Sequence, residues 1–184
     1  MRTFAQSIAI LFMFATGAVN AEKAPDSVNK VVPDIKALTS NSVIVDAVKA
    51  QNAKNISLDE IKKKDVAWQG TTGVDDFMTG LLNSAAAKEM LKFEKTKSYY
   101  TELFLMDNQG ANVAMTNKTS DYWQGDEAKW QKSFDGGKGA THIGDVKFDD
   151  SAQAYLVQVS LPVMDGDKAI GAITVGINLD ELEK

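Results

Sequence analysis

Residues 168–179 read KAIGAITVGINL and have the alternating pattern of a β-strand. Side chains at every second position share one face of a strand, and here they are Ile173, Val175, Ile177 and Leu179. Asp165-Gly166, just before the stretch, predicts a tight hairpin turn whose two central residues need positive φ. We therefore expect the second arm of a hairpin, with its apolar face pointing at helices.

The same two-residue period runs through the rest of the second half of the chain. Asp107-Asn108-Gln109-Gly110 lies between two alternating runs and predicts a tight turn closed by glycine. A short helix is expected over residues 126–134, where Trp130 and Phe134 lie four apart on one face. Strands are expected over residues 101–106, 111–115, 142–148, 152–163 and 168–178.

The first half has the three- and four-residue spacing of helices. Ser57-Leu58-Asp59-Glu60 is a capping-box pattern and predicts a short helix as far as Trp68. Further helix is expected over residues 74–95, in one or two pieces. A long N-terminal helix, with Pro33 near its start, is indicated by Val28, Val31, Val32, Ile35 and Leu38. The fold class is α+β, an antiparallel sheet of five or six strands flanked by helices.

The first 21 residues have the pattern of a secretory signal peptide. Arg2 precedes the apolar run Ile8–Phe14, and Val19-Asn20-Ala21 has small side chains where signal peptidase requires them. The alternative is an uncleaved membrane anchor, but the run is shorter than the roughly 20 residues that span a bilayer. We expect cleavage after Ala21, a periplasmic location and a single domain over residues 22–184. No later segment is long and apolar enough to span a membrane.

Composition excludes several classes of function. The net charge of −5 argues against nucleic-acid binding, which needs a basic face. The chain has no cysteine and one histidine, so thiol catalysis is excluded and a metal site is not expected. Serine-hydrolase, zinc-protease and phosphate-loop motifs are missing from the sequence. We therefore expect neither an enzyme nor a bound cofactor.

The order of the elements resembles the extracellular Cache (PDC-type, PAS-like) sensor domains of chemoreceptors and sensor kinases. The resemblance covers about residues 28–182 and rests on the N-terminal helix, the aromatic loop-helix and three quoted patterns. These are LFLMD-x-x-G from Leu103, PVMD from Pro162 and IGAI-x-VGI-x-L from Ile170. It implies a PAS-like sheet with a small-molecule pocket between the sheet and the loop-helix segment, here residues 115–130.

Two departures from the family pattern affect the expected function. Many members carry an arginine in the loop-helix to hold a ligand carboxylate, and this chain has Ala128 and Lys129 near that place. Members are usually tethered to a cytoplasmic output domain, whereas this chain ends at Lys184. We therefore expect the output on a separate membrane-bound partner: a chemoreceptor, a histidine kinase or a cyclic-nucleotide enzyme. The N-terminal helix offers a face for a homodimer.

The loop-helix supplies most of the candidate ligand-binding residues. Aromatic faces attract amines and carboxylates neutralise cations, so an amine-bearing or cationic ligand is the sharper hypothesis. The alternative is that the rings pack in the core and that Asp126 and Glu127 favour a helix N-terminus. The candidates in this segment are Asn117, Asp121, Tyr122, Trp123 and Trp130.

Two further candidates lie on the strands that follow. Asp149 matches an acidic position that family members often place on the strand closing the pocket, although Asp149-Asp150 is also good turn chemistry. His142 is a candidate pocket residue, with an ordinary strand position as the alternative. Together these features predict a periplasmic sensor that binds a small molecule and signals through the membrane-bound partner. The alternative is a periplasmic interaction protein without a small-molecule ligand.

Overall fold

The computed structural model describes residues 22–149 and 153–184, so the expected signal peptide and Asp150 lie outside the described residues. A six-stranded antiparallel sheet forms its centre, in the order β2-β1-β6-β5-β3, with β4 also paired to β5. The expected α+β class with a five- or six-stranded antiparallel sheet is confirmed. The strands are β1 (Tyr100–Met106), β2 (Asn112–Met115), β3 (His142–Ile143), β4 (Lys147–Asp149), β5 (Ala154–Asp165) and β6 (Lys168–Asn178).

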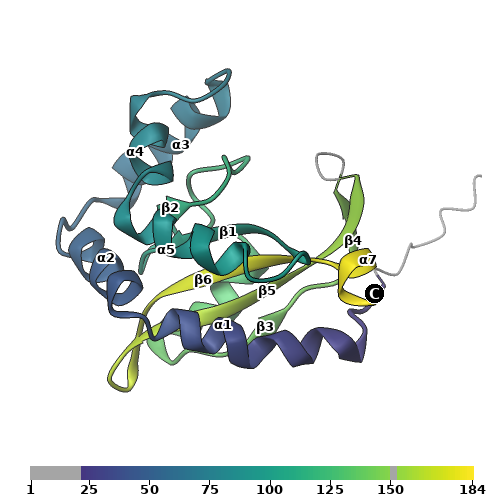
Figure 1. Cartoon of the computed structure of the whole chain (residues 1–184). Coiled ribbons are helices and arrows are strands. Elements are labelled where there is room, and N and C mark those ends of the chain that lie inside the picture. The colour runs from purple at the N-terminus through teal and green to yellow at the C-terminus, as the bar shows by residue number, and fades with distance from the viewer. Residues whose placement is uncertain (1–21, 150–152) are drawn as a thin grey trace, which may run out of the picture.

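The helices are arranged around this sheet (Figure 1). The long N-terminal helix is a 3-10 segment, η1, that runs directly into α1, because Pro33 lies in the first turn of α1. Ser57 and Glu60 make both bonds of the predicted capping box at the start of α3. The helical segments are η1 (Asp26–Val31), α1 (Val32–Thr39), α2 (Ser42–Asn52), α3 (Leu58–Gly70), α4 (Asp76–Leu82), α5 (Ala85–Glu94), α6 (Ala128–Phe134), η2 (Asp135–Gly137) and α7 (Leu179–Leu182). In the described part of the chain, no helix has the length and apolar character needed to cross a membrane.

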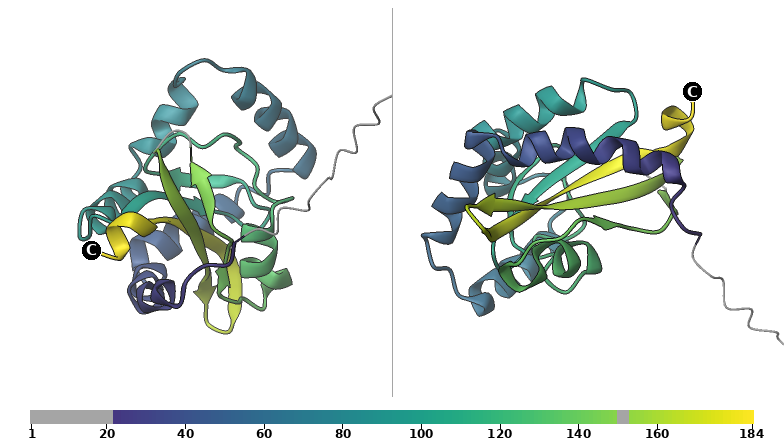
Figure 2. Two further views of the ribbon diagram at one scale, coloured as in Figure 1. Left: turned by 90° about the vertical axis from the view of Figure 1, so that its right-hand side faces the viewer. Right: turned by 90° about the horizontal axis from the view of Figure 1, so that it is seen from below.

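One face of the sheet packs against η1, α1, α2 and α5 (Figure 2). The alternating residues of β6 that the sequence assigns to the helix side, Ile173, Val175 and Ile177, have no exposed surface. They meet Ile35 of α1 and Val48 of α2 in the same apolar cluster. Burial of this large apolar area is the main force that holds the helices on the sheet.

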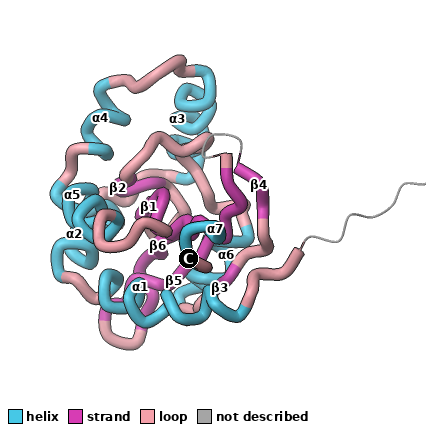
Figure 3. The backbone as a smooth tube through the Cα atoms, turned by 45° about the vertical axis from the view of Figure 1, so that its right-hand side comes forward, coloured by secondary structure: helices cyan, strands magenta, loops and turns pink. Residues whose placement is uncertain are grey.

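A second apolar cluster lies on the opposite face, under α3, α4 and the loop before α6. Phe104 and Met106 of β1 point into it, because they alternate with the helix-facing Leu103 and Leu105. Trp68 of α3 and Tyr122 of the loop complete its centre. The loops on this side run over the sheet without becoming strands (Figure 3).

The predicted hairpin between β5 and β6 is confirmed, but two local details differ from expectation. The β5–β6 turn is centred on Gly166 and Asp167, and only Gly166 has a positive φ, +60°. Glycine at the first central position is typical of a type II′ turn, which needs one positive φ instead of two. The strand expected over residues 142–148 is two short strands, because Val146 N–H leaves the ladder and donates to the Glu22 carbonyl.

Candidate functional site

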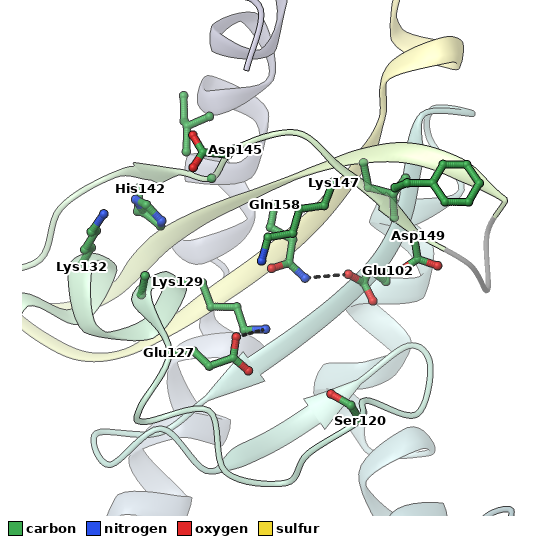
Figure 4. A pocket seen from close by; sticks show the side chains of 15 residues that line it. Glu102, Ser120, Glu127, Lys129, Lys132, His142, Asp145, Lys147, Asp149 and Gln158 are labelled. Carbon is green, nitrogen blue, oxygen red and sulfur yellow. Dashed lines mark hydrogen bonds and ion pairs between the residues drawn. The ribbon is translucent and has the colours of Figure 1, made fainter. Parts of the chain in front are cut away.

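A cavity of about 470 Å³ lies on the face of the sheet that does not carry the N-terminal helix. Its floor is formed by β1 and β5, and its walls by α6 and by the β3–β4 segment (Figure 4). The lining is rich in charge of both signs. The cavity is lined by the carboxylates Glu102, Glu127, Asp145 and Asp149, by the ammonium groups of Lys129, Lys132 and Lys147, and by His142, Gln158 and Ser120.

Helix α6 is held in place by hydrogen bonds from its own side chains. Trp130 Nε1 donates to the Asp107 carbonyl at 3.0 Å, which ties the helix to the end of β1. Gln131 Nε2 donates to the Gly125 carbonyl at 3.2 Å, and the Trp130 ring stacks on Phe134 at 4.9 Å between centroids. These contacts fix the wall of the cavity that carries two of its lysines.

Lys129 is the least exposed of the ion-paired side chains in the described part of the chain. Its side chain is 14% exposed, and Nζ lies 3.0 Å from Glu127 Oε2. The same ammonium group lies 5.1 Å from the centre of the Phe104 ring, within cation–π range. Lys129 therefore places a positive charge in the wall of the cavity.

His142 lies in β3, next to the end of α6 that carries Lys132 (Figure 4). Burial lowers the pKa of His142 below its usual range, and the positive charge of Lys132 adds to the effect. Asp145 acts in the opposite direction. Burial and the charge of Lys132 both favour the neutral form of the imidazole over the charged one.

Of the seven candidates from the sequence, the structure brings His142 and Asp149 to the cavity lining. Trp130 is not part of the lining, but its bond to the Asp107 carbonyl holds α6, which forms one wall of the cavity. Tyr122 is 1% exposed in the second core, and Trp123 donates from Nε1 to the Gln109 carbonyl at 2.8 Å. The two rings therefore have packing roles in this structure, and their contact with a ligand stays a prediction.

The other two candidates lie at the surface beside the loop. Asn117 is exposed, and its Nδ2 donates to the Thr101 carbonyl at 3.3 Å. Asp121 accepts from Gln69 Nε2 at 2.8 Å and from Ser120 Oγ at 2.6 Å. Neither residue is part of the cavity lining, and for both the ligand-binding role stays a prediction.

Sequence reasoning missed most of the charged lining. Lys129 and Lys132 are three residues apart, so they share a helix face, and this signal was available. Glu102 and Gln158 were harder to find, because they meet only after β1 and β5 are placed on either side of β6. Strand alternation puts Glu102 on the face opposite Leu103, but it does not show what that face is next to.

The six-stranded antiparallel sheet with its flanking helices is like that of PDC (Cache) sensor domains. The family model of the methyl-accepting chemotaxis protein-like first PDC sensor domain matches residues 78–184. This is more than half of the chain, and the protein belongs to that family. The search of curated proteins gave no match.

Similar solved structures include sensor domains of two kinds of receptor. The sensor domain of the Vibrio cholerae histidine kinase DctB has a TM-score of 0.45 and 13% identity, with 85% of this chain and 51% of that chain covered. The ligand-binding domain of the Campylobacter jejuni chemoreceptor Tlp3, in complex with 4-methylisoleucine, has a TM-score of 0.43 and 12% identity, with 86% and 62% covered. The ligand-binding domain of the Pseudomonas aeruginosa amino-acid chemoreceptor PctC, in complex with GABA, has a TM-score of 0.39 and 11% identity, with 84% and 63% covered. The chain thus covers between half and two thirds of these structures.

Proposed function

We propose that the protein is a periplasmic sensor that binds a small, charged molecule in the cavity and signals through a membrane-bound protein. The observation that carries the proposal is the lining, where carboxylates and lysines from the sheet, α6 and the β3–β4 segment converge on one space of about 470 Å³. A volume of this order suits a small-molecule ligand. Residues 22–184 act as one sensing domain after removal of the signal peptide.

The mixed charge of the lining favours a ligand with both a carboxylate and an amine. Four carboxylates and three lysines line the cavity, so neither an anion nor a cation alone is matched by the whole surface. Lys129 and Lys132 of α6 are the groups suited to a ligand carboxylate. Amino acids of moderate size are the simplest compounds with this pair of charges.

Signalling follows from the position of the cavity between α6, the sheet and the β3–β4 segment. A ligand that bridges α6 and the β3–β4 segment binds more tightly when that segment is drawn toward the helix, and it therefore shifts the population toward the closed arrangement. The closed arrangement would then change the surface that docks on the membrane-bound protein. A homodimer through the N-terminal helix would double this docking surface.

A thermal-shift screen of the purified protein tests the proposal. The panel contains amino acids, amines, organic acids, purines and sugars. We expect one class to stabilise the protein, by about 2.7 kcal/mol at a hundredfold excess over Kd. A flat response across the panel would contradict the proposal and support an interaction protein without a ligand, which a pull-down from envelope extract would then examine.

Lys129→Met is expected to weaken binding of the stabilising compound by about tenfold or more, because a hydrogen bond to a charged group is worth about 1.5–3 kcal/mol. Isothermal titration calorimetry measures the change. Lys92→Met is the matched control, since Lys92 pairs with Glu89 on the surface and is 72% exposed. Equal affinity of the Lys129→Met variant and the control would show that Lys129 does not contact the ligand.

A further inference from the structure

The floor of the cavity contains the carboxylate of Glu102, which, among the described residues, accepts a hydrogen bond at only one of its two oxygens. Glu102 of β1 and Gln158 of β5 are both registered with Gly176 of β6, so they lie on either side of a residue without a side chain. Gln158 Nε2 donates to Glu102 Oε1 at 2.9 Å across this gap (Figure 4). The bond fixes the direction of the carboxylate and leaves its second oxygen available.

Gly176 is required for this arrangement. A Cβ at position 176 would lie 2.6 Å from Glu102 Cγ and 2.7 Å from Thr101 Oγ1, both far inside van der Waals contact. The bulge between Tyr100 and Glu102 accounts for the two neighbouring side chains on one face of β1. Any larger residue at position 176 would therefore displace the carboxylate from the floor.

The lysines of the lining, Lys129, Lys132 and Lys147, form no ion pair with Glu102 in the described part of the chain. None of the ion pairs found among residues 22–149 and 153–184 includes Glu102, and Lys129 is already paired with Glu127. Thr101 Oγ1 is buried next to Glu102 without a hydrogen-bond partner, and so is Glu94 Oε2. Burial raises the pKa of the Glu94 carboxyl, and the negative charge of Glu102 contributes to the rise. A carboxylate without an ion pair on the floor of a partly enclosed cavity is suited to a ligand cation.

A metal ion is a poor candidate for that cation. The described residues contain no group of three or more histidine, cysteine, aspartate or glutamate side chains placed to hold one. A protonated amine needs fewer contacts: one carboxylate oxygen and one or two neutral acceptors satisfy its hydrogens. The second oxygen of Glu102, which lines the cavity, supplies the carboxylate acceptor.

We propose that Glu102, oriented by Gln158 and accommodated by Gly176, selects ligands that carry a protonated amine. This inference rests on the proposed function and assigns the amine end of the ligand to the floor of the cavity. The carboxylate end then faces α6 with its lysines. Amine selection therefore depends on β1, outside the loop-helix where the aromatic side chains are concentrated.

The test compares matched compounds on matched variants. Each amino acid in the panel is measured by thermal shift and calorimetry beside its N-acetyl derivative, which has no protonated amine, and beside its amide, which keeps the amine. Glu102→Gln removes the charge but preserves the size and the bond to Gln158. Glu89→Gln makes the same change at a surface pair on α5 and serves as the control.

We expect compounds that stabilise the protein to share a protonated amine, and their N-acetyl derivatives to bind at least tenfold more weakly. Glu102→Gln should weaken the amines by about tenfold to a hundredfold, whereas Glu89→Gln should leave their affinity unchanged. Gly176→Ala, in a protein with an unaltered circular dichroism spectrum, should give the same loss with the carboxylate still present. Strong binding by compounds without an amine, or full affinity in Glu102→Gln, would overturn the inference while ligand sensing stands. Failure of every compound on the unaltered protein would overturn the proposed function and this inference with it.

Discussion

Tyr122→Ala is expected to lower the free energy of unfolding by about 3–5 kcal/mol, the usual cost of truncating a large buried aromatic residue. The Tyr122 side chain is 1% exposed, and its ring centroid lies 5.7 Å from that of Trp68 and 5.3 Å from that of Phe77. Removing the ring leaves a cavity between α3, α4 and the sheet. Urea unfolding followed by circular dichroism measures the loss, which corresponds to a fall in Tm of about 6–20 °C for a chain of this size.

Tyr122→Phe is the matched control, because it keeps the ring and removes only the hydroxyl. Burial raises the pKa of that hydroxyl to about 12, so it is uncharged at any pH used for the comparison. We expect Tyr122→Phe to retain most of the stability. Ligand affinity of the folded fraction should stay within a few-fold in both variants, since Tyr122 is not part of the cavity lining. A Tyr122→Ala protein of normal stability that no longer binds the ligand would instead make Tyr122 a ligand contact.

The regular elements were predictable because their signals are local. Alternation along residues 168–178 marks β6, and the structure buries the side chains that this pattern assigns to the core. The capping box at Ser57 gives the start of α3 within one residue. The two parts of the 74–95 helix, α4 and α5, are separated where Ser84 caps the second one. Each of these signals is contained in fewer than a dozen consecutive residues.

The candidate site was predictable only in part, because it depends on contacts between distant segments. The loop-helix was the correct region for one wall, since α6 carries Lys129 and Lys132. Tyr122 and Trp123, however, lie against α3, and the indole N–H groups of Trp123 and Trp130 donate to backbone carbonyls. Trp68 and Tyr122 are 54 positions apart, and no local pattern pairs them. The aromatic content of the segment correctly indicated that it lies at the cavity. It did not show which side chains pack in the core and which charged side chains face the cavity.

Two kinds of residue have different roles in this part of the structure. Apolar and aromatic residues of the loop-helix fix the position of α6, while charges on α6, β1 and the β3–β4 segment form the surface of the cavity. Substitutions in the lining therefore affect ligand affinity more than stability, and substitutions behind it do the reverse. The variants of Glu102 and Tyr122 represent the two cases.

Asp107 lies between the core residues and the cavity wall. Its substitution is expected to give the second large loss in the free energy of unfolding. The side chain is 3% exposed, and Oδ1 accepts from Gln109 N at 2.8 Å and from Ala111 N at 2.9 Å. Its carbonyl accepts the Trp130 bond that holds α6. Asp107→Ala leaves two backbone donors without partners, which costs about 1–3 kcal/mol each, and loosens the cavity wall. Urea unfolding measures the loss.

Asp107→Asn separates the hydrogen bonds from the charge, because an amide oxygen can accept both backbone bonds. Burial raises the pKa of the Asp107 carboxyl in the folded protein, so the folded state binds its proton more tightly than the unfolded state does. The contribution of Asp107 to the free energy of unfolding therefore falls as pH rises from its unfolded pKa of about 4 to its raised folded pKa. Above that window the contribution no longer changes with pH. We expect Asp107→Asn to lack this component: relative to the unaltered protein it gains stability through the same window and keeps the gain at neutral pH. Unfolding free energies of both proteins from pH 4 to pH 8 test this. If Asp107→Asn were as unstable as Asp107→Ala throughout, the negative charge itself would hold the turn, because the backbone bonds alone would not be sufficient.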